Sequence, residues 1–158
     1  MRFEDTLQIL SAFEREGARY ALVGSMGMAA HGIARATMDV DIFIDPHPSN
    51  VARIRRALMS IFDDPAIEQI VSEELAGPYP VIRYGPPESD FVIDLIARLG
   101  DAFSFDDIES EQQTSDGITF RVATPAMLYR MKRDTMRPRD RLDAEELREA
   151  FKLESDQR

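Results

Sequence analysis

The sequence predicts an α/β (α+β) fold in which a small mixed β-sheet is flanked by helices. Two observations indicate the sheet: a period-two alternation over Asp39–Ile44 and a mostly apolar run over Asp90–Ile96. A third indicates the helices, since apolar residues recur three or four positions apart near both ends of the chain. At 158 residues, the chain is expected to form one domain over residues 1–158, with C-terminal helices from about residue 125.

The N-terminal segment is expected to form a helix, a short strand and a helix-like stretch. Apolar side chains at helical spacing predict an amphipathic helix over Phe3–Glu16, which Gly17 is suited to end. The apolar run Tyr20–Val23 predicts a strand that stops at Gly24-Ser25, and Met26–His31 is helix-like. The glycine is therefore expected to form a turn between a strand and a helix start.

The middle of the chain is expected to contain strands and one helix. Asp39–Ile44 alternates acidic and aromatic residues with aliphatic ones, which is typical of a strand. A proline-rich turn follows, and Ser49 or Asn50 is expected to cap the next helix. Shorter strands are expected at about Ile67–Val71 and at Val81–Tyr84.

The C-terminal third is expected to form a hairpin and two helices. The segment Asp106–Arg121 is acidic, and Asp116-Gly117 within it favours a hairpin that ends in Ile118–Val122. Apolar spacing predicts a short helix from Pro125 and a second helix over roughly Pro138–Leu153.

Composition excludes several classes of protein. The chain has no cysteine, so it can have neither disulfides nor a thiolate metal site. No apolar run approaches the roughly 20 residues needed to span a bilayer, and the N-terminus lacks the organisation of a signal peptide. A cytoplasmic location is therefore expected. The formal net charge of −10 argues against broad electrostatic binding to nucleic acid.

One C-terminal segment is locally basic. Its cationic residues are Arg130, Lys132, Arg133, Arg137, Arg139 and Arg141. Such a surface within an acidic protein suits a small polyanion, for example a nucleoside triphosphate or the end of an RNA. The alternative is an ordinary solvated helix face.

Paired carboxylates are the most informative feature of the sequence. Asp39 and Asp41 stand two apart on a predicted strand, so both side chains point to the same face. Two negative charges at such a short distance repel each other, and a divalent cation is the simplest partner that offsets the repulsion. Upstream, the turn at Gly24-Ser25 offers backbone N–H groups and a hydroxyl to an anion such as phosphate. The two features together suggest nucleotide chemistry.

A third carboxylate, Asp94, lies within an otherwise apolar predicted strand. An isolated buried carboxylate is unfavourable, so Asp94 is expected to be paired, neutralised or bound to metal. If its strand lies beside Asp39–Ile44, the three carboxylates converge and can bind two magnesium ions. The alternative is a strand-end residue that bonds loop N–H groups.

These residues resemble the pattern of the polymerase β-like nucleotidyltransferase superfamily. The pattern is a glycine-serine turn at Gly24-Ser25, an Asp-x-Asp strand at Asp39-Val40-Asp41 and a third acidic residue at Asp94. The stretch Gly24–Asp41 is more narrowly similar to small bacterial nucleotidyltransferases, including abortive-infection toxins of toxin–antitoxin systems. Lys132 and the later Arg139-Asp140…Asp143 resemble the closing element of those proteins, and the similarity covers about residues 18–148.

The resemblance implies transfer of a nucleoside monophosphate from an NTP to an acceptor, with Mg²⁺ or Mn²⁺ as cofactor. It assigns metal binding and catalysis to three residues: Asp39, Asp41 and Asp94. It assigns contacts with the nucleotide phosphates to three others: Gly24, Ser25 and Lys132. Arg35 and Thr37 are further candidates to reach the triphosphate or to order their loop, or else a surface arginine and a strand-edge threonine.

Three functional hypotheses follow. The first is a metal-dependent nucleotidyltransferase whose acceptor is an RNA, a protein or a small molecule, and the toxin interpretation of it adds an antitoxin partner. The second is a catalytically inactive nucleotide-binding or interaction module of the same fold. The third is a metal-dependent phosphohydrolase, which would release phosphate where the first releases pyrophosphate.

Overall fold

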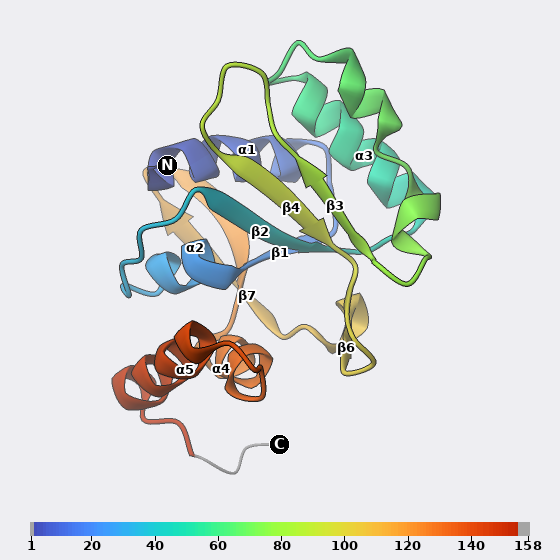
Figure 1. Cartoon of the computed structure of the whole chain (residues 1–158). Coiled ribbons are helices and arrows are strands. Elements are labelled where there is room, and N and C mark those ends of the chain that lie inside the picture. The colour runs from blue at the N-terminus through green and yellow to red at the C-terminus, as the bar shows by residue number, and fades with distance from the viewer. Residues whose placement is uncertain (1, 155–158) are drawn as a thin grey trace.

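The computed structural model describes residues 2–154 and contains a six-stranded mixed sheet with helices on both sides (Figure 1). The sheet strands are β1 (Tyr20–Val23), β2 (Asp39–Ile44), β3 (Val81–Tyr84), β4 (Val92–Ile96), β7 (Ser110–Ser115) and β8 (Ile118–Ala123). The α-helices are α1 (Phe3–Arg15), α2 (Gly24–Ala30), α3 (Pro48–Met59), α4 (Pro125–Arg133) and α5 (Pro138–Phe151). Short elements complete the chain: β5 (Arg98–Leu99), β6 (Phe103–Ser104) and the 3₁₀ helices η1 (Pro65–Gln69), η2 (Ser72–Leu75) and η3 (Phe105–Asp107).

The strand order places the carboxylate-bearing strands next to each other. The order is β3-β4-β2-β1-β8-β7, with β2 parallel to β4 and antiparallel to β1. In this register Asp41 of β2 lies opposite Asp94 of β4. Strand β3 pairs antiparallel with β4 at one edge of the sheet, which sets Arg83 opposite Asp94.

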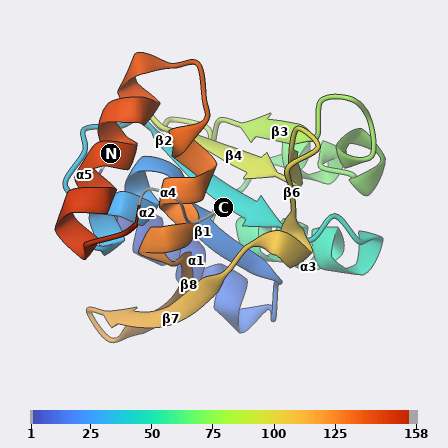
Figure 2. The ribbon, with the colours of Figure 1, turned by 90° about the horizontal axis from the view of Figure 1, so that it is seen from below.

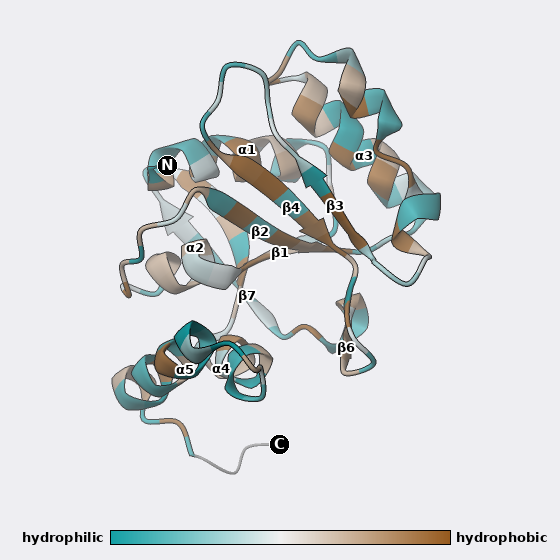
Figure 3. Cartoon of the chain, viewed as in Figure 1, coloured by the Kyte–Doolittle hydropathy of each residue, from teal (hydrophilic) through white to brown (hydrophobic). Residues whose placement is uncertain are grey.

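The two faces of the sheet pack against different helices (Figures 1 and 2). Alternate strand residues such as Leu22, Ile42 and Leu95 join α1 and α3 in one apolar core. The opposite face contributes Val23 and Phe43 to a second core with α4 and α5. Figure 3 shows the apolar residues concentrated along the central strands, whereas α5 is mostly hydrophilic. The period of two along each strand therefore divides the core into two layers.

The elements expected from the sequence are largely confirmed. The predicted mixed α/β class is correct, and β1, β2 and β3 have the predicted bounds. The hairpin turns at Asp116-Gly117, where both residues have positive φ angles, and joins β7 to β8. Thr124 begins α4 because its hydroxyl accepts a hydrogen bond from the backbone N–H of Met127.

Two local expectations were wrong. Residues 67–71 form no strand. Asp64 caps the 3₁₀ helix η1, and the buried side chains of Ile67 and Ile70 are three positions apart, which is the spacing of one 3₁₀ turn. Helix α3 is capped by His47, whose ring accepts a hydrogen bond from the N–H of Ser49, and not by Ser49 or Asn50.

Within residues 2–154, no helix is both long and apolar enough to cross a membrane.

Candidate active site

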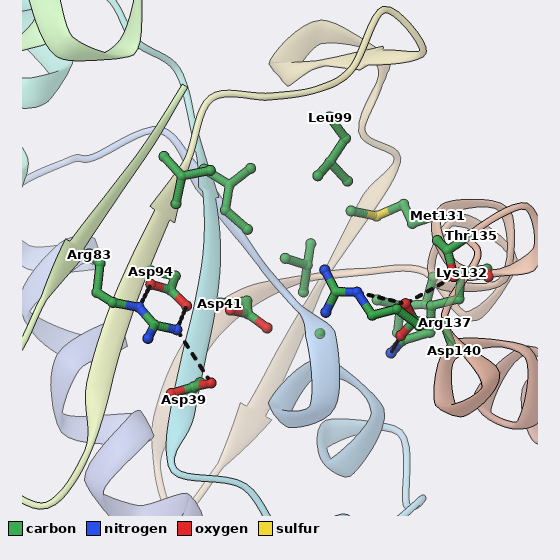
Figure 4. A pocket seen from close by; sticks show the side chains of 15 residues that line it. Asp39, Asp41, Arg83, Asp94, Leu99, Met131, Lys132, Thr135, Arg137 and Asp140 are labelled. Atoms are coloured by element: carbon green, nitrogen blue, oxygen red, sulfur yellow. Dashed lines mark hydrogen bonds and ion pairs between the residues drawn. The ribbon is translucent and has the colours of Figure 1, made fainter. Parts of the chain in front are cut away.

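A cleft of about 360 Å³ lies between the sheet and the α4–α5 helices. Figure 4 shows Asp39, Asp41 and Asp94 on the wall formed by the sheet, with Lys132 and Asp140 on the opposite wall. Apolar side chains complete the lining: Val23, Val81, Ile96, Leu99, Leu128 and Met131. The cleft therefore combines an acidic wall, a polar wall with a lysine, and an apolar surface between them.

The three carboxylates converge because of strand alternation and register. Val40 and Ile42 are fully buried in the core behind the sheet, so Asp39 and Asp41 must face the other way. Asp94 pairs with Asp41 across parallel strands and is itself only 8% exposed. The sequence hypothesis that Asp94 lies beside the Asp-x-Asp strand is thus matched by the geometry.

Asp41 lies in an environment that disfavours its ionised form. Burial, followed by the nearby carboxylates of Asp94 and Asp39, raises its pKa to about 6, although Lys132 acts to lower it. A carboxyl group in this state binds a proton or a cation more readily than an ordinary aspartate.

Arg83 forms ion pairs with two of the three carboxylates. Its Nε donates to Asp94 Oδ1 at 3.0 Å and its Nη2 donates to Asp94 Oδ2 at 3.2 Å. The same Nη2 lies 3.7 Å from Asp39 Oδ2. Arg83 was not expected from the sequence, because its role depends on the pairing of β3 with β4. We call Asp39, Asp41 and Asp94 the acidic cluster.

Position 24 needs a glycine because its turn lies against the carboxylate of Asp41. Its φ angle is +65°, and a Cβ at this position would overlap the carboxylate of Asp41. A side chain there would push Asp41 out of place. Gly24 lines the cleft, and its contact with a nucleotide stays a prediction.

Ser25 and Thr37 do not line this cleft. Ser25 is half-buried in the first turn of α2. The Thr37 hydroxyl accepts from the backbone N–H of Asp39 at 3.1 Å and donates to its carbonyl at 3.2 Å. These hydrogen bonds tie the Thr37 side chain to the backbone at the start of β2, and its contact with a triphosphate stays a prediction.

Lys132 and Arg35 meet at one buried carboxylate, Asp143, which is 2% exposed. Lys132 Nζ donates to Asp143 Oδ2 at 2.9 Å, and Arg35 Nε donates to Asp143 Oδ1 at 2.8 Å. Arg35 also pairs with Glu146 at 2.7 Å and does not line the cleft. Asp140 lies 3.5 Å from Lys132 and faces the cleft. This network joins the loop before β2 to α4 and α5.

The donor chemistry of the acidic cluster fits a hard divalent cation. Three carboxylates supply oxygen ligands of the kind that Mg²⁺ and Mn²⁺ prefer, and burial together with the neighbouring carboxylates raises the pKa of Asp41. Across residues 2–154, however, no three acidic or histidine side chains already surround a common cation position. Arg83 engages both oxygens of Asp94 and would therefore compete with a cation for this carboxylate.

The overall architecture is that of a nucleotidyltransferase fold. The crystal structure of a Thermotoga maritima protein described as a "putative nucleotidyltransferase" matches with a TM-score of 0.56, over 94% of this chain and 91% of that chain. The two sequences are 15% identical, so this likeness shows a shared fold. No curated protein matches the sequence.

The family is identified by the sequence itself. Residues 8–157 match the family described as the nucleotidyl transferase AbiEii toxin of type IV toxin–antitoxin systems. The chain belongs to this family. The match spans the glycine-serine turn, the Asp-x-Asp strand and the C-terminal helices, and it confirms the resemblance that those motifs indicated.

Proposed function

We propose that this protein is a metal-dependent nucleotidyltransferase that transfers a nucleoside monophosphate from an NTP to an acceptor, as the toxin of a toxin–antitoxin pair. The observation that carries the proposal is the in-register pairing of Asp41 with Asp94 beside Gly24, in a cleft faced by Lys132. Membership of the AbiEii family supports both the reaction class and the existence of an antitoxin partner.

The acidic wall is proposed to hold Mg²⁺ or Mn²⁺ through Asp39, Asp41 and Asp94. A divalent cation in that position supplies charge neutralisation for the triphosphate and for the negative charge that develops during transfer. Asp94 is also proposed to accept the proton of an attacking hydroxyl, a role that its position in the lining of the cleft supports.

The remaining groups are proposed to bind the nucleotide. Gly24 and Ser25 form the turn where the phosphates approach, and the missing side chain at Gly24 keeps the space beside Asp41 open. Lys132 reaches the cleft from the opposite wall, and its bonds to Asp143 hold it there. Leu99 and Met131 offer an apolar surface to the nucleoside.

One observation favours the second candidate, a nucleotide-binding module without turnover. Arg83 already pairs with Asp94 and Asp39, and a permanent ion pair there would keep metal out. Against this, one guanidinium faces three carboxylates, which leaves negative charge that a binding role alone does not need.

A label-transfer assay separates the candidates. The protein is incubated with α-labelled NTP and Mg²⁺ and with RNA, protein or small-molecule fractions of a cell extract. We expect label on an acceptor and release of pyrophosphate with the wild type, and neither with Asp41→Ala. Asp101→Ala is the matched control, because Asp101 is exposed in a turn outside the cleft.

The other outcomes identify the alternatives. Nucleotide binding with no label in any fraction would support the binding module, and free phosphate as product would indicate a phosphohydrolase. The net charge of −10 favours a protein or small-molecule acceptor over one recognised through an extended RNA surface. Label in the RNA fraction alone would contradict that preference and leave the reaction class intact.

A further inference from the structure

We propose that Arg83 is an internal counter-ion of the acidic cluster, which a divalent cation displaces and which then binds the phosphates of the nucleotide. This inference rests on the proposed function, because it concerns the same cleft. It assigns Arg83 two successive partners, a carboxylate before the cation binds and a phosphate afterwards.

The contact with Asp94 has the geometry of a fork on a carboxylate. Two nitrogens of Arg83 donate to the two oxygens of Asp94 at 3.0 and 3.2 Å, and Asp39 lies 3.7 Å away. The guanidinium therefore uses up carboxylate oxygens that a cation at this wall requires. Within the described chain, the side chain of Arg83 has its hydrogen bonds and ion pairs with these two aspartates alone.

The two partners differ in how freely they can move. Asp94 is 8% exposed on a central strand, and its backbone pairs with both β2 and β3. Arg83 stands on the edge strand β3 with its side chain 63% exposed, so the guanidinium can swing outward without unpacking the core. If the pair separates, Arg83 is the member that moves.

The pair is nevertheless open to displacement. Water reaches the exposed guanidinium and screens part of its attraction to Asp94, even though the fork makes the pair stronger than an ordinary surface ion pair. A divalent cation brings twice the charge to the same oxygens and is joined by the phosphates of its nucleotide. The acidic cluster retains net negative charge with Arg83 in place, which attracts that cation.

Once released, Arg83 remains at the cleft. It lines the same cavity as Lys132 and Arg137, from the opposite wall, so a triphosphate between the walls would meet cationic side chains on both sides. A guanidinium fork fits two phosphate oxygens as well as it fits a carboxylate. The exchange thus keeps Arg83 paired in both states.

Two binding measurements test the proposal, because loss of Arg83 is expected to strengthen cation binding and to weaken nucleotide binding. Mn²⁺ binding without nucleotide is measured by electron paramagnetic resonance for the wild type, Arg83→Ala and Arg121→Ala. Arg121 is an exposed arginine that bonds Ser110 far from the cleft, so its variant controls for net charge. We expect Arg83→Ala to bind Mn²⁺ about three- to tenfold more tightly, because the competing guanidinium is gone.

The second measurement uses a non-hydrolysable NTP analogue at saturating Mn²⁺. Here we expect Arg83→Ala to bind the analogue about three- to tenfold more weakly, because a phosphate contact is lost. Arg121→Ala should match the wild type in both measurements. If Arg83→Ala does not fold, Arg83→Gln keeps much of the side-chain length, removes the charge and is expected to show the same two directions.

The outcomes distinguish this proposal from the proposed function. A purely structural Arg83 predicts that both affinities fall or that neither changes, and either result would overturn the counter-ion role while metal-dependent transfer still stands. If neither the wild type nor the variant binds Mn²⁺, the counter-ion role and the metal dependence both fail. Tighter Mn²⁺ binding with weaker analogue binding supports the exchange.

Discussion

Asp41 and Asp94 lie directly opposite each other on the parallel strands β2 and β4, on the face of the sheet that lines the cleft. Neither side chain can turn into the core, because the alternate positions of both strands are filled by buried aliphatic residues. The fold thus holds two carboxylates together whether or not a cation is present. This arrangement stores electrostatic free energy that ligand binding can release.

The first prediction concerns the stability of the metal-free protein. Burial and the neighbouring carboxylates raise the pKa of Asp41 to about 6 in the folded state, above its ordinary value of 3.8. Ionisation of Asp41 therefore destabilises the fold at neutral pH. We expect Asp41→Asn to increase the free energy of unfolding at pH 8 by up to about 3 kcal/mol, measured by urea denaturation in EDTA.

The gain in the free energy of unfolding from Asp41→Asn is expected to depend on pH. As the pH falls below the folded-state pKa near 6, the wild-type carboxyl takes up a proton and the gain from Asp41→Asn shrinks. By pH 4 the gain should be nearly absent. Asp101→Asn, at an exposed turn, should change stability little at any pH. An Asp41→Asn variant that is less stable than wild type at pH 8 would contradict the argument.

The second prediction concerns the glycine turn. Gly24→Ala places a Cβ against the Asp41 carboxylate at a φ of +65°, where side chains are disfavoured. We expect a loss of about 1 to 3 kcal/mol in the free energy of unfolding and loss of nucleotide transfer. Gly85→Ala is the matched control, since nothing lies within 4 Å of its Cβ position. Equal activity of the two variants would show that the turn tolerates a side chain.

Local patterns were sufficient to predict the carboxylate wall. The alternation of acidic and aliphatic residues over Asp39–Ile44 defines both the strand and its polar face. The place of Asp94 needed one further fact, the pairing of β4 with β2, and the family resemblance supplied it as an expectation.

The features that the sequence analysis missed depend on contacts between distant segments. Arg83 and Asp94 are 11 residues apart and meet only through the register of β3 on β4. Arg35 and Asp143 are 108 residues apart, and nothing in their separate helix and loop segments indicates that they pair. The 3₁₀ helix η1 was missed because a short apolar run is ambiguous between a strand and a helical turn.

The third prediction concerns the buried carboxylate of Asp143. Burial acts to raise its pKa, but hydrogen bonds from Lys132 and Arg35 outweigh burial, so the pKa lies below its ordinary value. The ionised form therefore stabilises the fold above the unfolded-state pKa, and that contribution is lost as the pH falls through the lower, folded-state value. We expect Asp143→Asn to lower the free energy of unfolding at pH 7 by about 2 kcal/mol, because two partly buried cations lose their shared buried carboxylate.

A surface ion pair provides the comparison for Asp143. Glu145 pairs with Arg148 at 2.9 Å on the exposed side of the same helix. Glu145→Gln should therefore change the free energy of unfolding by less than about 0.5 kcal/mol. Similar effects of the two substitutions in urea denaturation at pH 7 would mean that Asp143 has no special role in joining α5 to the loop before β2.

The last prediction concerns metal removal, measured by calorimetry without any substrate. A cation that binds only the folded protein stabilises it, by about 2.7 kcal/mol when its concentration is about a hundred times the Kd. We expect Mg²⁺ or Mn²⁺ to raise the Tm of the wild type and EDTA to reverse the rise. Asp39→Asn removes an exposed carboxylate, which we propose as a cation ligand, without disturbing the core, so the Tm of this variant should respond less to the cation. Asp101→Asn should respond as the wild type does, and a uniform rise in all three proteins would assign the effect to non-specific ion binding instead of the cleft.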